Sequence, residues 1–309
     1  MQSLGVLLLA YGGPNTLDDI PAFLREVRGG QSVPQPLIDE TTRRYRLIGG
    51  YSPLLTITRQ LASRLQNAIE MPVYIGMRHS SPYIADTVRE MAQDRITHAT
   101  VICLAPHYSR MSIGAYRAKL DEAVQTVIAS RETAKQPPNF DFIESWHRQA
   151  RYVEGVANNV RVALARFSTN PKIIFTAHSL PVSAREPYES HLRETAQLVT
   201  QNLVLPDERW MLCYQSKPRA SGDWLEPLIE NVIPQLALTG EKNVVIAPIG
   251  FVADHLEVLY DLDISVRDLA CAKGVRVVRT PMLNDSDALV AALAELVKER
   301  NRQSGMRET

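Results

Sequence analysis

The amino-acid sequence predicts an α/β fold made of two similar halves, each with a parallel β-sheet flanked by helices. Three observations predict it. Short apolar runs of strand length alternate with longer amphipathic stretches, the runs end in Gly, Pro or Ser, and motifs that close the early runs recur later in the same order. Alternating strands and helices favour right-handed crossovers and therefore parallel sheets.

Eight runs rich in Val, Ile or aromatic residues are the predicted strands. They span 4–10, 72–77, 99–106, 140–145, 172–178, 210–216, 243–250 and 275–279. No basic residue precedes the first run, which is far shorter than the ~20 residues that a membrane span requires. We therefore expect a buried first strand, no integral membrane segment and a cytoplasmic location.

Two amphipathic stretches are the clearest predicted helices. Residues 54–70 and 285–299 each repeat apolar side chains at helical spacing, which predicts one buried face. The residues on these faces are Leu54, Ile57, Leu61, Leu65 and Ile69 in the first stretch and Leu289, Leu293 and Val297 in the second.

A weak internal repeat favours two sheets of four strands over one sheet of eight. The first run ends Ala10-Tyr11-Gly12-Gly13-Pro14 and the fifth ends Ala177-His178-Ser179-Leu180-Pro181. The third and seventh runs both end in Ala-Pro. We expect one half over residues 1–155 and the other over 156–309, and the C-terminal helix could pack back on the first half.

Composition excludes several classes of protein. The 309 residues carry 34 Lys+Arg and 34 Asp+Glu, so the formal net charge is +0 and the basic excess of a nucleic-acid binder is missing. A hydrophobic content of 45% argues against wholesale disorder. The three cysteines form no CxxC pair, so neither a disulfide framework nor a thiolate metal cluster is expected.

Nucleotide binding, the usual function of this architecture, is not supported. Gly12-Gly13 follows a strand, but no third glycine completes GxGxxG, and no GK[ST] supplies a phosphate-binding lysine. Ser179 is not a nucleophile elbow, because GxSxG is absent.

The residues just after the predicted strands are the candidates for a functional site, because ligands of open α/β sheets bind beyond the carboxyl ends of the strands. These residues are Tyr11, His79, His107-Tyr108-Ser109, His178-Ser179, Gln215-Ser216-Lys217, Asp254-His255 and Glu257. They are rich in imidazole, phenol and carboxylate groups, which predicts a cleft for proton or metal chemistry.

The strongest acid/base feature is the run from Asp254 to Asp263. In a helix, Glu257 and Asp261 share a face, and Asp254 lies near the same line. Carboxylates in one stripe repel each other unless protons or a cation intervene. The alternative is structural, with Asp254 as the helix N-cap and Glu257 at N3. His178, similarly, could be a structural histidine rather than a catalyst.

Five motifs together resemble the ferrochelatase family, in family order and over nearly the whole chain. They are Leu9-Ala10-Tyr11-Gly12-Gly13-Pro14, Ile48-Gly49-Gly50-Tyr51-Ser52-Pro53-Leu54, Leu104-Ala105-Pro106-His107-Tyr108-Ser109, Thr176-Ala177-His178-Ser179-Leu180-Pro181 and the block from Pro248 to Asp261. The resemblance implies two Rossmann-like, chelatase-like halves with a porphyrin cleft between them. It also implies a lyase that inserts Fe²⁺ into a porphyrin in haem biosynthesis.

The resemblance identifies His178 and Glu257 as the metallation pair. Metallation removes two pyrrole protons, and a neutral imidazole with a pKa near ~6.5 can accept one. Imidazole and carboxylate are also ligands for Fe²⁺. Asp261 would continue an acidic path for protons or iron. Some bacterial relatives carry another acid where this chain has Ser265, which weakens the case for a secondary metal site.

The resemblance also implies porphyrin contacts. Tyr11 would face His178 across the macrocycle and bind the product iron, as in the branch that uses coproporphyrin, or would simply line the cleft. The residues that match propionate contacts are Arg28, Arg44, Tyr45, Ser52 and Tyr116. Arg43 and Arg46 complete a basic cluster that favours the extra carboxylates of coproporphyrin, or form a solvated face. His79 matches a cleft histidine of unsettled role.

We therefore expect a short bacterial ferrochelatase that converts coproporphyrin III to coprohaem III. Protoporphyrin IX as substrate, a cobalt or nickel chelatase, and a non-catalytic porphyrin or haem carrier are the alternatives. Porphyrin and ferrous iron are the expected partners, with iron as a substrate. We expect a monomer, no tightly bound cofactor, no iron–sulfur cluster and no nucleic acid. A partner that donates porphyrin or accepts haem cannot be identified from the sequence.

Overall fold

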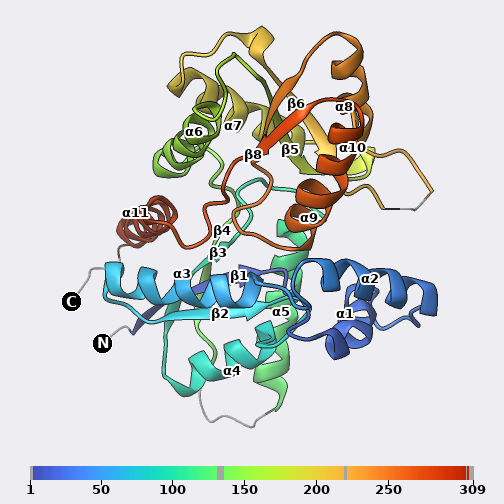
Figure 1. The fold of residues 1–309 in the computed structure, drawn as a ribbon. Helices are drawn as coiled ribbons and strands as arrows, with labels where there is room; N and C mark the ends of the chain where they lie inside the picture. Colours follow the sequence, from blue (N-terminus) through green and yellow to red (C-terminus); the bar gives the residue numbers. More distant parts are fainter. Residues whose placement is uncertain (1–2, 131–135, 219–220, 304, 306–309) are drawn as a thin grey trace. The chain divides into compact units, whose positions relative to one another are not determined.

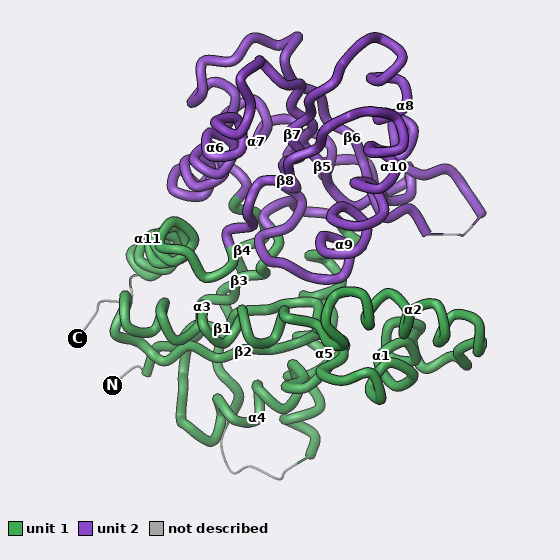
Figure 2. The backbone as a smooth tube through the Cα atoms, viewed as in Figure 1, with its two compact units in different colours: residues 1–105, 110–146, 284–309 green, residues 106–109, 147–283 purple. Residues whose placement is uncertain are grey.

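The computed structural model describes residues 3–130, 136–218, 221–303 and 305. The chain divides into two compact units (Figure 2). Unit 1 holds residues 1–105, 110–146 and 284–309, and unit 2 holds residues 106–109 and 147–283. The long segment of unit 2 begins at residue 147, whereas the boundary expected after residue 155 falls inside helix α6 (Ala150–Leu164).

Unit 1 is built on four parallel strands, β1 (Leu4–Ala10), β2 (Val73–Met77), β3 (His98–Cys103) and β4 (Asn139–Ile143) (Figure 1). Their order in the sheet is β2-β1-β3-β4, with Val6 opposite Val73 and Leu4 opposite His98. The four strands predicted in this part of the sequence are confirmed. The central strand β1 is buried from Gly5 to Ala10, as its apolar sequence predicts.

The helices of unit 1 pack in pairs. They are α1 (Ile20–Val27), α2 (Gln35–Leu47), α3 (Leu54–Ile69), α4 (Ile84–Gln93), α5 (Ile113–Ser130) and α11 (Asp287–Gln303), with a 3₁₀ turn at Leu17–Asp19. α3 packs against α11, α4 packs against α5, and α1 packs against α2. α11 comes last in the sequence but belongs to unit 1, as Figure 2 shows.

The predicted apolar faces of α3 and α11 are buried, with one exception. Leu289, Leu293 and Val297 of α11 are fully buried. In α3, Ile57 is only partly buried, and Thr58 lies on the buried face beside it. The Thr58 hydroxyl donates a hydrogen bond to the Leu54 carbonyl, 2.7 Å away, so this polar group has a partner inside the core.

Unit 2 repeats the sheet of unit 1. Its strands are β5 (Lys172–His178), β6 (Trp210–Gln215), β7 (Asn243–Pro248) and β8 (Arg276–Arg279), all parallel and in the order β6-β5-β7-β8. This order matches that of unit 1 strand for strand. The prediction of two four-stranded parallel sheets from the short sequence repeat is therefore confirmed.

Helices of unit 2 pack on its sheet. They are α6 (Ala150–Leu164), α7 (Tyr188–Asn202), α8 (Ile229–Leu238), α9 (Leu256–Leu259) and α10 (Arg267–Ala272), with a π-helical segment at Asp261–Val266 and 3₁₀ turns at Val182–Ala184 and Asp207–Arg209. Ile174 and Ile246 form a core with residues of α8 and α10. Successive strand residues point to opposite faces, so Ile173 and Val245 face away from that core. In the part of the chain that the structure describes, no helix is both long and apolar enough to span a membrane.

Candidate functional site

The candidate site of unit 2 lies where the strand order reverses. β5 and β7 are neighbours, and their crossovers lead to β6 on one side and β8 on the other, the arrangement at whose carboxyl ends open α/β sheets bind their ligands. His178 is the last residue of β5, and the segment that follows β7 leads into α9. The sheet topology therefore brings these two segments together although they are about eighty residues apart in the sequence.

Gly250 lets the loop after β7 cross the end of β5. Its backbone N–H donates to the Thr176 carbonyl, 3.1 Å away. A β-carbon at position 250 would lie 2.7 Å from the α-carbon of Ala177, which is closer than real side chains approach a backbone. Only glycine therefore allows this crossing, and the crossing carries the chain toward His178.

His178 and Glu257 form a direct pair. The distance from His178 Nδ1 to Glu257 Oε2 is 2.9 Å, and the two side chains are 28% and 33% exposed. A carboxylate accepts hydrogen bonds, so Nδ1 is the donor. The other ring nitrogen, Nε2, is then the atom that gains and loses a proton when His178 titrates.

The pair favours the charged form of both groups. Burial lowers the pKa of His178, but the Glu257 carboxylate, with help from Asp261, outweighs it, and the net shift is upward. Burial raises the pKa of Glu257, but His178, His255 and the Ser216 hydroxyl outweigh it and hold that pKa at about 2. Glu257 thus stabilises an imidazolium at position 178.

Buried polar groups fix the backbone around this pair. Gln215 is completely buried at the end of β6; it accepts a hydrogen bond from the Thr176 hydroxyl at 2.7 Å and donates to the Glu257 carbonyl at 2.8 Å. Ser216 has a φ of 59°, and its hydroxyl donates to Asp261 Oδ2 at 2.5 Å. A non-glycine residue in the left-handed region is a local strain that clusters at functional sites.

The predicted acidic stripe is divided among separate partners. α9 begins at Leu256 with His255 at the N-cap, so the interpretation of Asp254 as the N-cap is wrong. Asp254 instead contacts the Arg279 guanidinium at 3.4 Å. After one α-helical turn the helix widens, and Ser265 N–H donates to the Tyr260 carbonyl in a π-type bond of 2.9 Å.

At the equivalent strand ends of unit 1, Tyr11 and His79 lie together. Tyr11 follows β1, is 43% exposed, and its ring centroid lies 4.6 Å from that of His79. The His79 N–H donates to the Tyr11 carbonyl at 3.0 Å. Burial, then Arg78 and Lys119, lower the pKa of His79 to about 4, so this histidine is neutral near pH 7.

The residues expected to contact propionates occupy different settings. Arg43 and Arg44 both pair with Glu40 at 2.9 Å, and together they lower its pKa to about 2. Arg28 is exposed and donates to the Ser32 carbonyl at 3.3 Å.

Tyr45, Ser52 and Tyr116 are buried. Ser52 packs closely against Gly13, where a β-carbon would lie 2.5 Å from the Ser52 hydroxyl oxygen. The Ser52 N–H also donates to the Pro14 carbonyl at 2.8 Å. Ser52 therefore fixes the loop that follows β1, and Tyr11 is the first residue of that loop.

Arg279 is the functional candidate that the sequence analysis missed. It ends β8 and makes a two-pronged ion pair with Asp263, with distances of 2.6 and 2.8 Å. The sequence held a signal for Arg279: it is a basic residue at the end of the last predicted strand, and the preceding predicted strand is followed by the acidic run from Asp254 to Asp263. Tyr188 was also missed; its hydroxyl donates to the His178 carbonyl at 3.2 Å.

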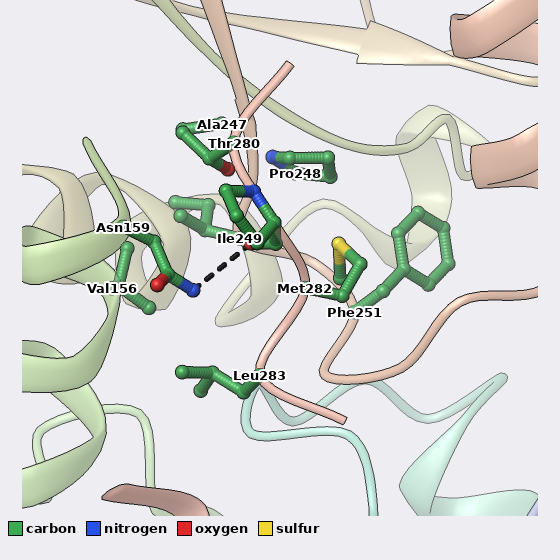
Figure 3. Close-up of a pocket in the computed structure, with 10 residues that line it drawn as sticks. Val156, Asn159, Ala247, Pro248, Ile249, Phe251, Thr280, Met282 and Leu283 are labelled. Carbon is green, nitrogen blue, oxygen red and sulfur yellow. Dashed lines mark hydrogen bonds between the residues drawn. The ribbon is translucent and has the colours of Figure 1, made fainter. Parts of the chain in front are cut away.

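The described residues contain no group of three or more His, Cys, Asp or Glu side chains able to hold a metal ion. Figure 3 shows a pocket beside β7 whose volume, about 10 Å³, is that of a single water. It is lined by Val156, Asn159, Ala247, Pro248, Ile249, Phe251, Thr280, Pro281, Met282 and Leu283. Because it is so small, it is not a site for an organic substrate.

Solved structures identify the class to which this fold belongs. SirB from Bacillus subtilis superposes with a TM-score of 0.58 at 13% identity, covering 98% of each chain. CbiX, the terminal enzyme of sirohaem biosynthesis in denitrifying bacteria, superposes with a TM-score of 0.56 at 12% identity, covering 96% of this chain and 99% of its own. The chain has the chelatase fold.

Sequence comparison is more specific. The family model for Ferrochelatase matches residues 3–301, and the chain belongs to the ferrochelatase family. A ferrochelatase from Deinococcus radiodurans is 38% identical over 97% of this chain and 96% of its own length. A coproporphyrin III ferrochelatase from Geobacillus kaustophilus is 34% identical over 99% and 98%. The resemblance stated from the motifs is confirmed, and the protein is a porphyrin metal chelatase, a lyase of haem biosynthesis.

Proposed function

We propose that this ferrochelatase inserts Fe²⁺ into coproporphyrin III and that His178 and Glu257 perform the metallation. The observation that carries the proposal is the bond between His178 Nδ1 and Glu257 Oε2, 2.9 Å long at the strand reversal of unit 2. It gives one proton acceptor, Nε2, and one carboxylate that stabilises the acceptor once it is charged. These are the groups that removal of pyrrole protons requires.

The proposed mechanism uses each group at a stated atom. His178 Nε2 accepts a pyrrole proton, and the resulting imidazolium is stabilised by Glu257 through Nδ1. A carboxylate oxygen of Glu257, and Nε2 of His178 while it carries no proton, are ligands that Fe²⁺ accepts. Asp261, which accepts a hydrogen bond from Ser216 at 2.5 Å, is an acceptor one turn further along; it would pass iron toward the pair and carry the first proton away, so that Nε2 can accept the second. Fe²⁺ enters as a substrate, and no tightly bound cofactor is required.

The choice of coproporphyrin III rests on residues of unit 1. Tyr11 is 43% exposed at the end of β1, so its phenol is accessible to a ligand. Arg43 and Arg44 both pair with Glu40 at 2.9 Å, which brings two guanidinium groups together on α2, and guanidinium groups are the usual partners of propionate carboxylates. The relative from Geobacillus kaustophilus carries coproporphyrin III in its name. The position of Tyr11 opposite His178 on the macrocycle stays a prediction, as do the monomeric state and the cytoplasmic location.

The test is an anaerobic Fe²⁺ insertion assay with coproporphyrin III and protoporphyrin IX in parallel. We expect kcat/KM to be higher for coproporphyrin III. A clear preference for protoporphyrin IX would overturn the choice of substrate and leave the metallation pair untouched. Tight porphyrin binding with no insertion at any pH between 5 and 9 would instead indicate a carrier.

A further inference from the structure

Arg279 makes the most extensive ion-pair contacts near the candidate site. Its side chain is 16% exposed. Nε and Nη2 reach the two carboxylate oxygens of Asp263 at 2.6 and 2.8 Å, Nη2 lies 3.4 Å from Asp254 Oδ1, and Nη1 donates to the Thr280 carbonyl at 2.8 Å. The planar guanidinium thus makes two hydrogen bonds to Asp263 and a longer ionic contact with Asp254, a combination that a lysine could not make with the same geometry.

The two acids flank the segment that carries Glu257. Asp254 lies just before α9, and Asp263 lies in the π-helical segment just after it. α9 itself is a single turn of four residues, and its N-cap residue His255 makes no side-chain capping bond. This turn runs on through the π-helical segment into α10, so Glu257 lies in the first turn of a longer helical stretch. The contacts on either side of that first turn help to fix the position of Glu257.

Two other contacts hold the segment near its middle. Gln215 donates to the Glu257 carbonyl, and Ser216 donates to Asp261. The side chains of Asp254 and Asp263 are only 20% and 32% exposed, so the guanidinium acts on both carboxylates with limited screening by water. Its loss removes a contact that reaches both flanks of the turn that carries Glu257.

We propose that Arg279 is a positioning residue, which ties the two ends of the segment 254–263 so that Glu257 is held on His178. This rests on the proposed function of the His178–Glu257 pair. Arg279 does not touch His178 or Glu257. Its effect on metallation passes entirely through the placement of Glu257.

The test compares Arg279→Gln with Arg276→Gln. Arg276 is an exposed arginine of the same strand, which stacks on Phe167 and donates to the Arg166 carbonyl at 3.1 Å. We expect Arg279→Gln to lower kcat for Fe²⁺ insertion by about 10- to 100-fold with the porphyrin KM unchanged, as for loss of an outer-shell partner. Arg279→Lys should recover part of the rate, and Arg276→Gln should match the wild type.

A double-mutant cycle separates positioning from general destabilisation. If Arg279 acts through Glu257, then adding Arg279→Gln to Glu257→Gln causes no further loss of kcat. The positioning role would be overturned if the kcat losses of the two single variants multiplied in the double variant, or if Arg279→Gln had a normal kcat. If Arg279→Gln does not fold, Asp263→Asn enters the same cycle, since it removes only the two-pronged contact.

The same cycle distinguishes this proposal from the function on which it rests. An impaired Glu257→Gln enzyme beside a normal Arg279→Gln enzyme would refute positioning alone. A Glu257→Gln enzyme with the wild-type rate would refute the metallation pair, whatever Arg279 does.

Discussion

The carboxyl ends of β5 and β1 hold the same place in two sheets of identical strand order, yet their chemistry is opposite. At the end of β5, His178 has a carboxylate partner, and its pKa is raised. At the end of β1 stands Tyr11, and beside it His79, which follows β2, is buried near two cations, so that its pKa falls to about 4. The fold thus decides where an imidazole stands, and the partners from neighbouring segments decide whether it is charged.

The loops after the strands decide which group lies beside each histidine. In unit 2, Gly250 lets the loop after β7 cross β5, and α9 then delivers Glu257. In unit 1, the residue beside the histidine is Tyr11, a neutral group that cannot stabilise an imidazolium as a carboxylate does. The position equivalent to His178 is therefore Tyr11, and the histidine beside it, which follows β2 rather than β1, has no carboxylate partner and stays neutral. Four substitutions test this contrast.

The largest effect is expected from His178→Ala. Removing the proton acceptor should lower Fe²⁺ insertion by about 10²- to 10⁴-fold, the usual value of a general base. Porphyrin binding, followed by fluorescence, should be retained. His98→Ala is the control, because that histidine begins β3, and its ring nitrogens lie 3.3 Å from the Thr97 hydroxyl and 3.4 Å from the Asn139 amide, which belong to neither half of the metallation pair. Near-normal insertion by His178→Ala would remove His178 from the chemistry.

Glu257→Gln should reduce kcat by about 10- to 100-fold and also move the pH profile. Insertion requires neutral His178, and Glu257 raises the pKa of this imidazole in the wild type, so kcat/KM falls as the pH drops through that raised pKa. The variant keeps the burial that lowers this pKa and loses the carboxylate that raises it. The acid limb of kcat/KM, measured from pH 5 to 9, should therefore shift to lower pH. An unshifted limb would contradict the electrostatic role of Glu257.

Tyr11→Phe should change the absorption spectrum of the bound product more than the rate of insertion. The phenol oxygen is the only atom removed, so a role as ligand of the product iron predicts a shifted absorption spectrum of the bound product. We expect insertion within about threefold of the wild type, since proton removal belongs to His178. A spectrum identical to that of the wild type would indicate that Tyr11 only lines the site.

The smallest effect on insertion is expected from His79→Gln, which should leave the acid limb unchanged. The effect on stability has a definite sign. Between pH 6.5 and 4 the unfolded chain binds a proton at His79 that the folded chain does not, so the wild type loses stability as the pH falls. Relative to pH 7, the wild type should lose about 2 kcal/mol more than the variant at pH 5. If urea unfolding gave the same loss of unfolding free energy between pH 7 and pH 5 for both proteins, the pKa of His79 would not be lowered in the folded state.

The sequence predicts the elements well because their signals are local. All eight strands appear where apolar runs end in Gly, Pro or Ser, and α11 buries Leu289, Leu293 and Val297 at the predicted spacing. The pair of His178 and Glu257 was predictable as well, but through family motifs, since spacing in the chain says nothing about a contact made across two strands.

What the sequence could not give has a physical reason in each case. Spacing assumes one regular helix after Asp254, whereas the chain makes one α turn and then a π segment. Asp254 fits an N-cap by residue type, but the Arg279 fork, which comes from a strand 25 residues later, holds it instead. Residues 106–109 belong to unit 2 while their neighbours belong to unit 1, and no local pattern marks such a short excursion.

The place of α11 has a consequence for synthesis of the protein. Unit 1 needs α11 to cover α3 and to pair Asn301 with Thr100 of β3 at 3.3 Å, yet α11 is translated after every strand of unit 2. During translation the first sheet therefore waits with an apolar side uncovered until all of unit 2 has been made. Unit 1, whose first strand is made before any strand of unit 2, is completed only after unit 2.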